Sequence, residues 1–136
     1  MNAAISCMIT APRATKTDTI PRATKTDTMR VVYVACPYSD PVPAIMKDRH
    51  DKATQYAAQL IEDGAIAFSP LTHSRPMVQY MEEHGEDWET WRTVDLAFLS
   101  MCTEIHVLRL PGWDSSVGVL SEVQEARRHG IKVIYV

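Results

Sequence analysis

PGWDSSVGVLSEVQEARRHG, residues 111–130, is a turn-rich loop that leads directly into a predicted helix. It lies between two strand patterns, EIHVLRL at residues 104–110 and IKVIYV at residues 131–136. Arg127 and Arg128 place positive charge in the last turn of the helix, and Gly130 ends it. The stretch is therefore predicted to be the centre of a strand–helix–strand unit.

The start of this helix is a candidate site. Ser115, Ser116 and Gly118 lie at the predicted N-terminus, where backbone N–H groups without partners attract anions. Glu122 follows one turn later, and a carboxylate beside such N–H groups is typical of a sugar or nucleotide site. The alternative is that Asp114 or a serine only caps the helix and Glu122 is a solvated surface residue.

The alternation of strands and helices extends back to residue 29. Short apolar runs at residues 30–35 (RVVYVA) and 65–69 (AIAFS) predict two more buried strands. Helices are predicted over residues 44–64 and from residue 87, whereas residues 70–76 are predicted to be a loop and residues 77–86 a short helix with a polar turn. The pattern predicts an α/β, flavodoxin/Rossmann-like three-layer fold, with a parallel sheet of four to five strands flanked by helices.

The apolar faces of two helices follow from their periodicity. The first helix is expected to turn Ile45, Ala53, Tyr56, Ala57, Leu60 and Ile61 toward the sheet. The helix after residue 116 is expected to bury Val119, Leu120, Val123 and Ala126.

Ligands of open α/β sheets bind outside the carboxyl ends of the strands. That edge collects the loops at residues 36–43, 69–76 and 111–117. We therefore expect five side chains to converge there: Tyr38, His73, Arg75, Trp113 and Ser116.

Asp95 is a second candidate because it falls on the apolar side of its helix, between Trp91 and Phe98. Burial of an unpaired carboxylate is costly and raises its pKa. Paired with Glu122, Asp95 would supply the two groups that displacement at an anomeric carbon requires, one to attack C1′ and one to protonate the leaving base. The alternative is that Asp95 is an ordinary surface or capping residue.

Composition and charge exclude several classes of function. A net charge of −3 without clustered Lys and Arg gives no reason to expect binding of a nucleic acid polymer. No apolar run approaches the roughly 18 residues of a membrane span. The histidines lie at no metal-ligand spacing, and the glycines form no dinucleotide or P-loop motif, so neither a metal nor an organic cofactor is expected.

Three cysteines, Cys7, Cys36 and Cys102, have no CxxC spacing and indicate neither a disulfide framework nor a zinc site, so a cytoplasmic location is expected. Cys36 and Cys102 are predicted to be small buried residues rather than nucleophiles. PRATKTDT occurs twice, at Pro12 to Thr19 and at Pro21 to Thr28, and its polar composition predicts a disordered tail over residues 1–28, with the functional domain at residues 29–136.

Four segments resemble the nucleoside 2-deoxyribosyltransferase superfamily: VYVACPY (residues 32–38), the helix ending at Gly64 before AIAFSP, TVDLAFLSMCTEIHVL (residues 93–108) and SVGVLSE (residues 116–122). The resemblance assigns the catalytic glutamate of that superfamily to Glu122 and its aspartate to Asp95. The transferases carry an aspartate six residues before the nucleophile, where this chain has Ser116; this serine resembles the branch that hydrolyses deoxynucleoside 5′-monophosphates. The overall sequence looks most like small bacterial and phage relatives without an assigned function.

The resemblance implies cleavage or transfer at the N-glycosidic bond of a nucleoside or its 5′-monophosphate, through a covalent intermediate on Glu122. Asp95 would orient the sugar or protonate the base. The implied substrate-binding residues are Pro37, Tyr38, His73, Trp113, Ser115, Ser116 and Gly118. A homo-oligomer is implied as well. Two alternatives stay open: a non-catalytic nucleotide-binding module, and a flavodoxin-like interaction domain.

Overall fold

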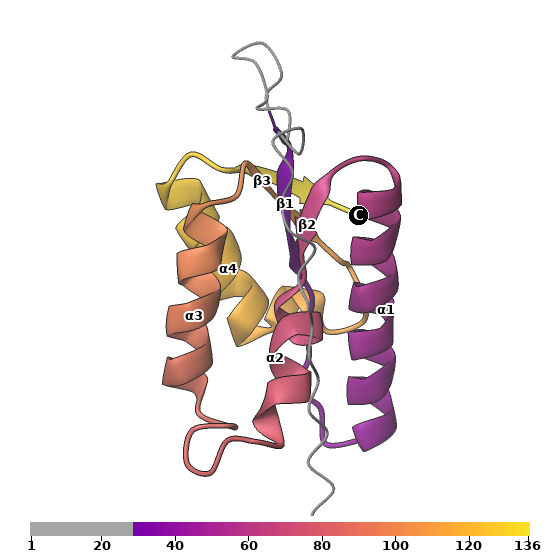
Figure 1. Ribbon diagram of the computed structural model, residues 1–136, viewed down its shortest axis with the longest axis vertical. Helices are drawn as coiled ribbons and strands as arrows, with labels where there is room; N and C mark the ends of the chain where they lie inside the picture. The colour runs from indigo at the N-terminus through magenta and orange to yellow at the C-terminus, as the bar shows by residue number, and fades with distance from the viewer. Residues whose placement is uncertain (1–28) are drawn as a thin grey trace, which may run out of the picture.

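Four parallel strands form one sheet in the computed structural model, which describes residues 29–136 (Figure 1). Helices α1 on one side and α3 and α4 on the other cover the sheet (Figure 1). The predicted α/β fold with a flanked parallel sheet is confirmed, with four strands in the order β2-β1-β3-β4. The duplicated tail predicted over residues 1–28 lies outside the described residues.

The elements follow the predicted alternation along the chain. Their bounds are β1 (Val31–Ala35), α1 (Pro43–Glu62), β2 (Ile66–Phe68), α2 (Pro70–Val78), α3 (Trp88–Ser100), β3 (Glu104–Val107), the 3₁₀ turn η1 (Trp113–Ser115), α4 (Val117–Arg128) and β4 (Lys132–Tyr135). β3 is shorter than the apolar pattern at residues 104–110, because its last three residues already belong to the loop that leads to α4.

The central strand β1 explains why the core has two halves. Its side chains alternate between the two faces of the sheet. Tyr33 and Ala35 pack with residues of α3 and α4, whereas Val32 and Val34 pack with residues of α1. Both faces are covered, which is the reason that the strand is apolar throughout.

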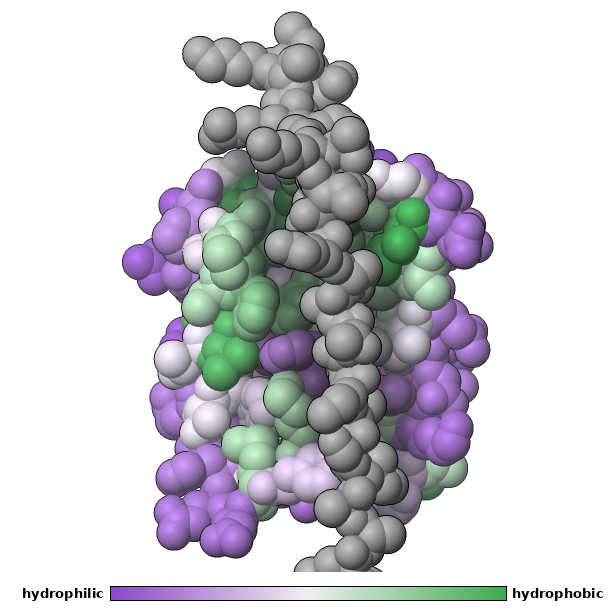
Figure 2. Space-filling view, viewed as in Figure 1, coloured by the Kyte–Doolittle hydropathy of each residue, from purple (hydrophilic) through white to green (hydrophobic). Residues whose placement is uncertain are grey.

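Helix α1 confirms the predicted helix but corrects its buried face. Ala53, Ala57 and Leu60 are buried as expected, whereas Ile45 and Ile61 are 40% and 57% exposed. A helix of 20 residues is about 30 Å long. It therefore extends past strands of three to five residues at both ends, where these two isoleucines lie. On the face seen in Figure 2, hydrophilic residues gather along the outer side of α1.

The predicted loop at residues 70–76 is wrong, because this segment forms α2 (Pro70–Val78). Ser69 caps the helix by accepting a hydrogen bond from the Thr72 N–H, at 3.4 Å. Pro70 occupies the first turn, where a missing N–H has no cost, and Pro76 lies in the last turn. Residues 79–87 are turns rather than the short helix predicted after Met77.

The stretch at residues 111–130 folds as predicted at its helix start. Ser116 is the N-cap of α4, and its Oγ accepts a hydrogen bond from the Val119 N–H, at 3.3 Å. Val119, Val123 and Ala126 are buried, but Leu120 is 50% exposed because it lies one position to the side of this face. The result is that Ser116 and Glu122 are placed on the same side of the sheet as α3.

None of the helices in residues 29–136 combines the length and the apolar character that crossing a membrane would require.

Candidate active site

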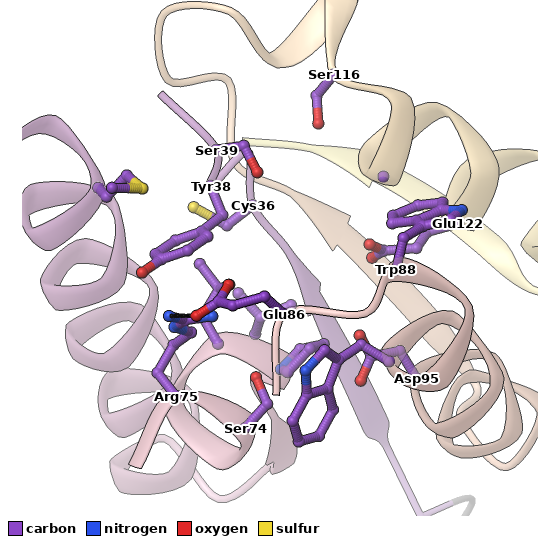
Figure 3. A pocket seen from close by; sticks show the side chains of 16 residues that line it. Cys36, Tyr38, Ser39, Ser74, Arg75, Glu86, Trp88, Asp95, Ser116 and Glu122 are labelled. Carbon is purple, nitrogen blue, oxygen red and sulfur yellow. Dashed lines mark hydrogen bonds and ion pairs between the residues drawn. The ribbon is translucent and has the colours of Figure 1, made fainter. Parts of the chain in front are cut away.

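A cavity of about 500 Å³ lies beyond the carboxyl end of β1, between α2, α3 and the start of α4 (Figure 3). This volume is in the range of small-molecule sites. It is lined by Val34, Cys36, Tyr38, Ser39, Met46, Pro70, Leu71, Ser74, Arg75, Glu86, Trp88, Trp91, Asp95, Ser116, Gly118 and Glu122.

Glu122 lies in the second turn of α4 and faces this cavity. Its Oε2 atom is buried and has no hydrogen-bond partner. Burial raises the pKa of Glu122 to about 8, and the charge of Asp95 adds to this rise. The Tyr33 hydroxyl lowers the pKa of Glu122, although its oxygen makes no hydrogen bond of ordinary geometry. Glu122 is therefore not an ordinary surface carboxylate.

Asp95 lies on α3 and lines the same cavity (Figure 3). Its Oδ1 atom is buried without a hydrogen-bond partner. Burial raises the pKa of Asp95 to about 6. Asp95 therefore lies on the inner side of its helix, as the helical periodicity predicts.

Tyr33 interacts with the two carboxyls from behind the cavity, which it does not line, and sequence reasoning missed it. The side chain is fully buried, and burial together with Glu122 and Asp95 raises the pKa of its hydroxyl well above the usual range. Its hydroxyl has no hydrogen-bond partner either. A tyrosine in an otherwise aliphatic strand was the available signal, since a buried phenol usually finds a polar partner.

The N-terminus of α4 borders the cavity beside Glu122. The first N–H groups of this helix, those of Val117 and Gly118, have no acceptor within the helix. A Cβ added at Gly118 would lie 3.6 Å from Trp88 Cζ3 and 3.8 Å from both Glu122 Oε1 and Ser116 Oγ. A side chain here would contact all three groups, so glycine leaves more room beside the N–H groups at the start of α4.

On the opposite wall, Arg75 is the positively charged side chain among the residues of 29–136 that line this cavity. The guanidinium of Arg75 lies 4.7 Å from the centroid of the Tyr38 ring. Arg75 Nη2 also donates to Glu86 Oε1, at 3.1 Å, in an exposed ion pair. Glu86, Trp88 and Trp91 also line the cavity, and none of the three was among the predicted site residues.

Two of the expected binding residues lie elsewhere. His73 is exposed and packs against Phe68 and Phe98, with ring centroids 5.3 and 5.5 Å away. His73 lies on helix α2 rather than in a loop, and its side chain does not line the cavity. Trp113 packs on Tyr135, at 5.4 Å between centroids, because η1 lies against β4. The predicted convergence at the sheet edge therefore holds for Tyr38, Arg75 and Ser116 but not for His73 and Trp113.

Pro37 and Ser115 line a second cavity, of about 600 Å³, that adjoins the first. The two cavities share Tyr38, Ser39, Trp88, Ser116 and Gly118. Pro37 and Ser115 therefore lie at the edge of the site rather than in its centre.

Cys36 and Cys102 are small buried residues, as predicted. Burial raises the pKa of Cys36 to about 12 and that of Cys102 to about 11. A thiol with such a pKa carries almost no thiolate at neutral pH, so neither is an activated nucleophile. Within residues 29–136, no group of three or more His, Cys, Asp or Glu side chains is arranged to hold a metal ion.

The sequence of residues 30–136 matches the family described as "Domain of unknown function (DUF1937)". The chain belongs to this family. A comparison with curated proteins gives no match. DUF1937 therefore supplies a family without supplying an activity.

Among solved structures, the fold is similar to that of a 2-deoxyribosyltransferase from the psychrotolerant bacterium Bacillus psychrosaccharolyticus. The two chains are 20% identical, with a TM-score of 0.55, and the match covers 77% of this chain and 70% of that one. The expected likeness to the deoxyribosyltransferase superfamily is confirmed at the level of the fold. The expected branch, that of 5′-monophosphate hydrolases, stays a prediction.

Proposed function

We propose that this protein cleaves the N-glycosidic bond of a deoxynucleoside 5′-monophosphate, with Glu122 as nucleophile and Asp95 as proton donor. One observation carries the proposal: two carboxyls from different helices face one cavity, each with a buried oxygen that no protein group satisfies. Buried polar atoms are normally paired, so unpaired ones facing a cavity are suited to a ligand. The deoxyribosyltransferase fold supports the same class of reaction.

The reaction would proceed by two displacements at C1′. The Glu122 carboxylate forms a bond to C1′ while the C1′–N bond breaks, and the base nitrogen takes the electron pair and a proton from Asp95. Water then attacks C1′ and frees Glu122, and the Asp95 carboxylate takes the proton of that water. If a second base attacks instead of water, the outcome is transfer.

The two pKa values determine how many protons the pair of carboxyls holds at a given pH. Between about pH 6 and pH 8, the pair of carboxyls holds one proton. By these values the proton resides mainly on Glu122. The reaction would use the minor state with the proton on Asp95, in which Glu122 is charged and Asp95 can donate.

The 5′-phosphate would bind at the start of α4. Phosphate oxygens would accept hydrogen bonds from the free N–H groups of Val117 and Gly118 and from the hydroxyl of Ser116. The space left by Gly118 admits them. Tyr38 would contact the base from the opposite wall. As the resemblance to the superfamily implies, the functional state would be a homo-oligomer.

A non-catalytic nucleotide-binding module is the second candidate. It is favoured by the pKa of Glu122 of about 8, because a largely protonated carboxyl is a poor nucleophile but a good hydrogen-bond donor to a ligand.

The two candidates differ in base release. The protein is incubated with pooled deoxynucleosides and their 5′-monophosphates, and free base is detected by mass spectrometry. Glu122→Gln should abolish base release while calorimetry still detects nucleotide binding. The matched control is Glu125→Gln, one turn further along α4, whose carboxylate pairs with Arg128 and His129 rather than facing the cavity.

Unchanged base release by Glu122→Gln would exclude Glu122 as the nucleophile. Tight nucleotide binding by the wild type without release of any base would favour the binding module.

A further inference from the structure

Arg49 is a buried cation that neither the sequence patterns nor the proposed chemistry uses. It lies on α1, on the face toward the sheet, and only 9% of its surface is exposed. A buried guanidinium requires acceptors for its N–H groups. Its acceptors identify what it does in the fold.

The guanidinium joins the two loops that border the cavity. Nη1 donates to the carbonyl oxygens of Tyr38 and Ser39, at 3.1 and 3.0 Å. Nη2 donates to the carbonyl oxygen of Pro111, at 2.8 Å. One side chain thus fastens the loop after β1, which carries Tyr38, to the loop after β3, which ends at Ser116.

The second loop is shaped to admit this contact. Gly112 has a φ of +91°, in the left-handed region that favours glycine. A Cβ at this position would approach Arg49 Nη2 to 3.1 Å, closer than such contacts normally are. Backbone conformation and the close approach of Arg49 therefore both require a glycine here.

The contacts fix a distance in addition to the ion pair that Arg49 forms with Asp40. Three acceptors are neutral carbonyl groups, and the carboxylate of Asp40 lies 3.9 Å from Nη2, beyond hydrogen-bonding distance. A planar fork that holds three carbonyls sets their relative positions, which a lysine could not reproduce. Tyr38 and Ser116 face the cavity from these two loops (Figure 3).

We propose that Arg49 is a positioning residue: it sets the separation of Tyr38 and Ser116, and thereby the preference of the site for a nucleoside 5′-monophosphate over the nucleoside. This inference rests on the proposed ligand class, with the base at Tyr38 and the phosphate at Ser116. A ligand that must touch both loops at once depends on their spacing, whereas a nucleoside without the phosphate depends on one loop only.

The test measures binding, so that it does not depend on turnover. Dissociation constants for deoxyguanosine, thymidine and their 5′-monophosphates are determined by calorimetry for the wild type, Arg49→Lys and Arg49→Met. Lys52→Met, on the exposed side of the same helix, is the control for loss of a cation. Thermal unfolding shows which variants are folded.

We expect Arg49→Lys to weaken monophosphate binding by at least about tenfold relative to nucleoside binding, because it retains the charge but loses the fork. Arg49→Met should behave alike, and Lys52→Met like the wild type. In a Ser116→Ala background, Arg49→Lys should no longer change the ratio of the two affinities.

Three results would overturn the inference. One is an unchanged ratio of monophosphate to nucleoside affinity in Arg49→Lys, and another is an equal loss of affinity for both ligands. The third is a loss of monophosphate affinity in Arg49→Met that is absent in Arg49→Lys, which would assign the effect to charge. If the arginine variants do not fold, Gly112→Ala disturbs the same contact from the other loop, and an unchanged ratio there refutes the inference. The proposed reaction fails separately, if the wild type binds monophosphates but releases no base.

Discussion

The pH dependence of base release provides the sharpest test of the proposed pair of carboxyls. Activity requires one proton on the pair, so the apparent rate constant should follow the fraction of singly protonated pair. With pKa values of about 6 for Asp95 and about 8 for Glu122, that fraction peaks near pH 7 at about 0.8. It falls about ninefold by pH 5 and by pH 9. The wild type should therefore show a bell-shaped profile of kcat/KM.

Substitution of Asp95 changes the shape of the profile and not only its height. In Asp95→Asn, the pKa of Glu122 should fall below 8, because the repulsion between the two carboxylates is lost. The remaining requirement is an ionised Glu122, so activity should rise with pH to a plateau, with no descending alkaline limb. Loss of the proton donor should also lower the maximum by roughly 10²–10⁴-fold.

The assay is the release of free base, separated by liquid chromatography at substrate concentrations well below KM. The second phosphate pKa of a nucleotide is about 6 and would distort the acid limb, so the profile is repeated with the corresponding deoxynucleoside. A wild-type profile with one limb, or a descending alkaline limb that persists in Asp95→Asn, would refute the shared-proton mechanism.

Three further predictions concern stability and the extent of the domain. On folding, the pKa of Glu122 rises from its ordinary 4.5 to about 8, so its contribution to stability is fully present below pH 4.5 and is lost as the pH rises to 8. We therefore expect Glu122→Gln to be more stable than the wild type at pH 8, on the order of a few kcal/mol. The two melting temperatures should converge near pH 4. Tyr33→Phe should unfold at the same or a higher temperature, because the hydroxyl it removes is buried and unpaired. The alkaline limb of the activity profile should also move to higher pH in this variant, because the Tyr33 hydroxyl lowers the pKa of Glu122. A chain that begins at Met29 should retain the melting temperature and the base release of the full chain; failure to fold or loss of release would show that residues 1–28 belong to the functional unit.

The strands and the two carboxyls could be predicted because periodicity determines them. Short apolar patterns located all four strands, of which the central strands β1 and β3 are buried, whereas the edge strands β2 and β4 are partly exposed. Helical spacing placed Asp95 on the inner side of α3. Glu122 lies about one turn after the start of α4, and this spacing placed it beside the free N–H groups of that helix.

The residues that sequence reasoning missed depend on contacts between distant segments. His73 was expected at the site because its segment follows a strand, but the rotation of α2 about its axis determines where the side chain points. The same segment was predicted to be a loop. Pro70 lies in the first turn of α2, which tolerates proline, whereas Pro76 lies inside the helix. The role of Arg49 could not be predicted from the sequence, because its hydrogen-bond acceptors are backbone carbonyl groups up to 62 residues away.

The unpaired polar atoms argue that the cavity is maintained for a ligand and not for stability. Among residues 29–136, four buried side-chain atoms lack a hydrogen-bond partner, and three of them belong to Tyr33, Asp95 and Glu122. Each buried polar group without a partner costs roughly 1–3 kcal/mol, so a protein selected only for stability would replace them by apolar side chains of similar shape. The three groups also interact electrostatically, because Asp95 and Glu122 both raise the pKa of Tyr33. Asp95 and Glu122 line the cavity, so a bound sugar with a ring oxygen and hydroxyl groups over these two carboxyls would satisfy their unpaired oxygens.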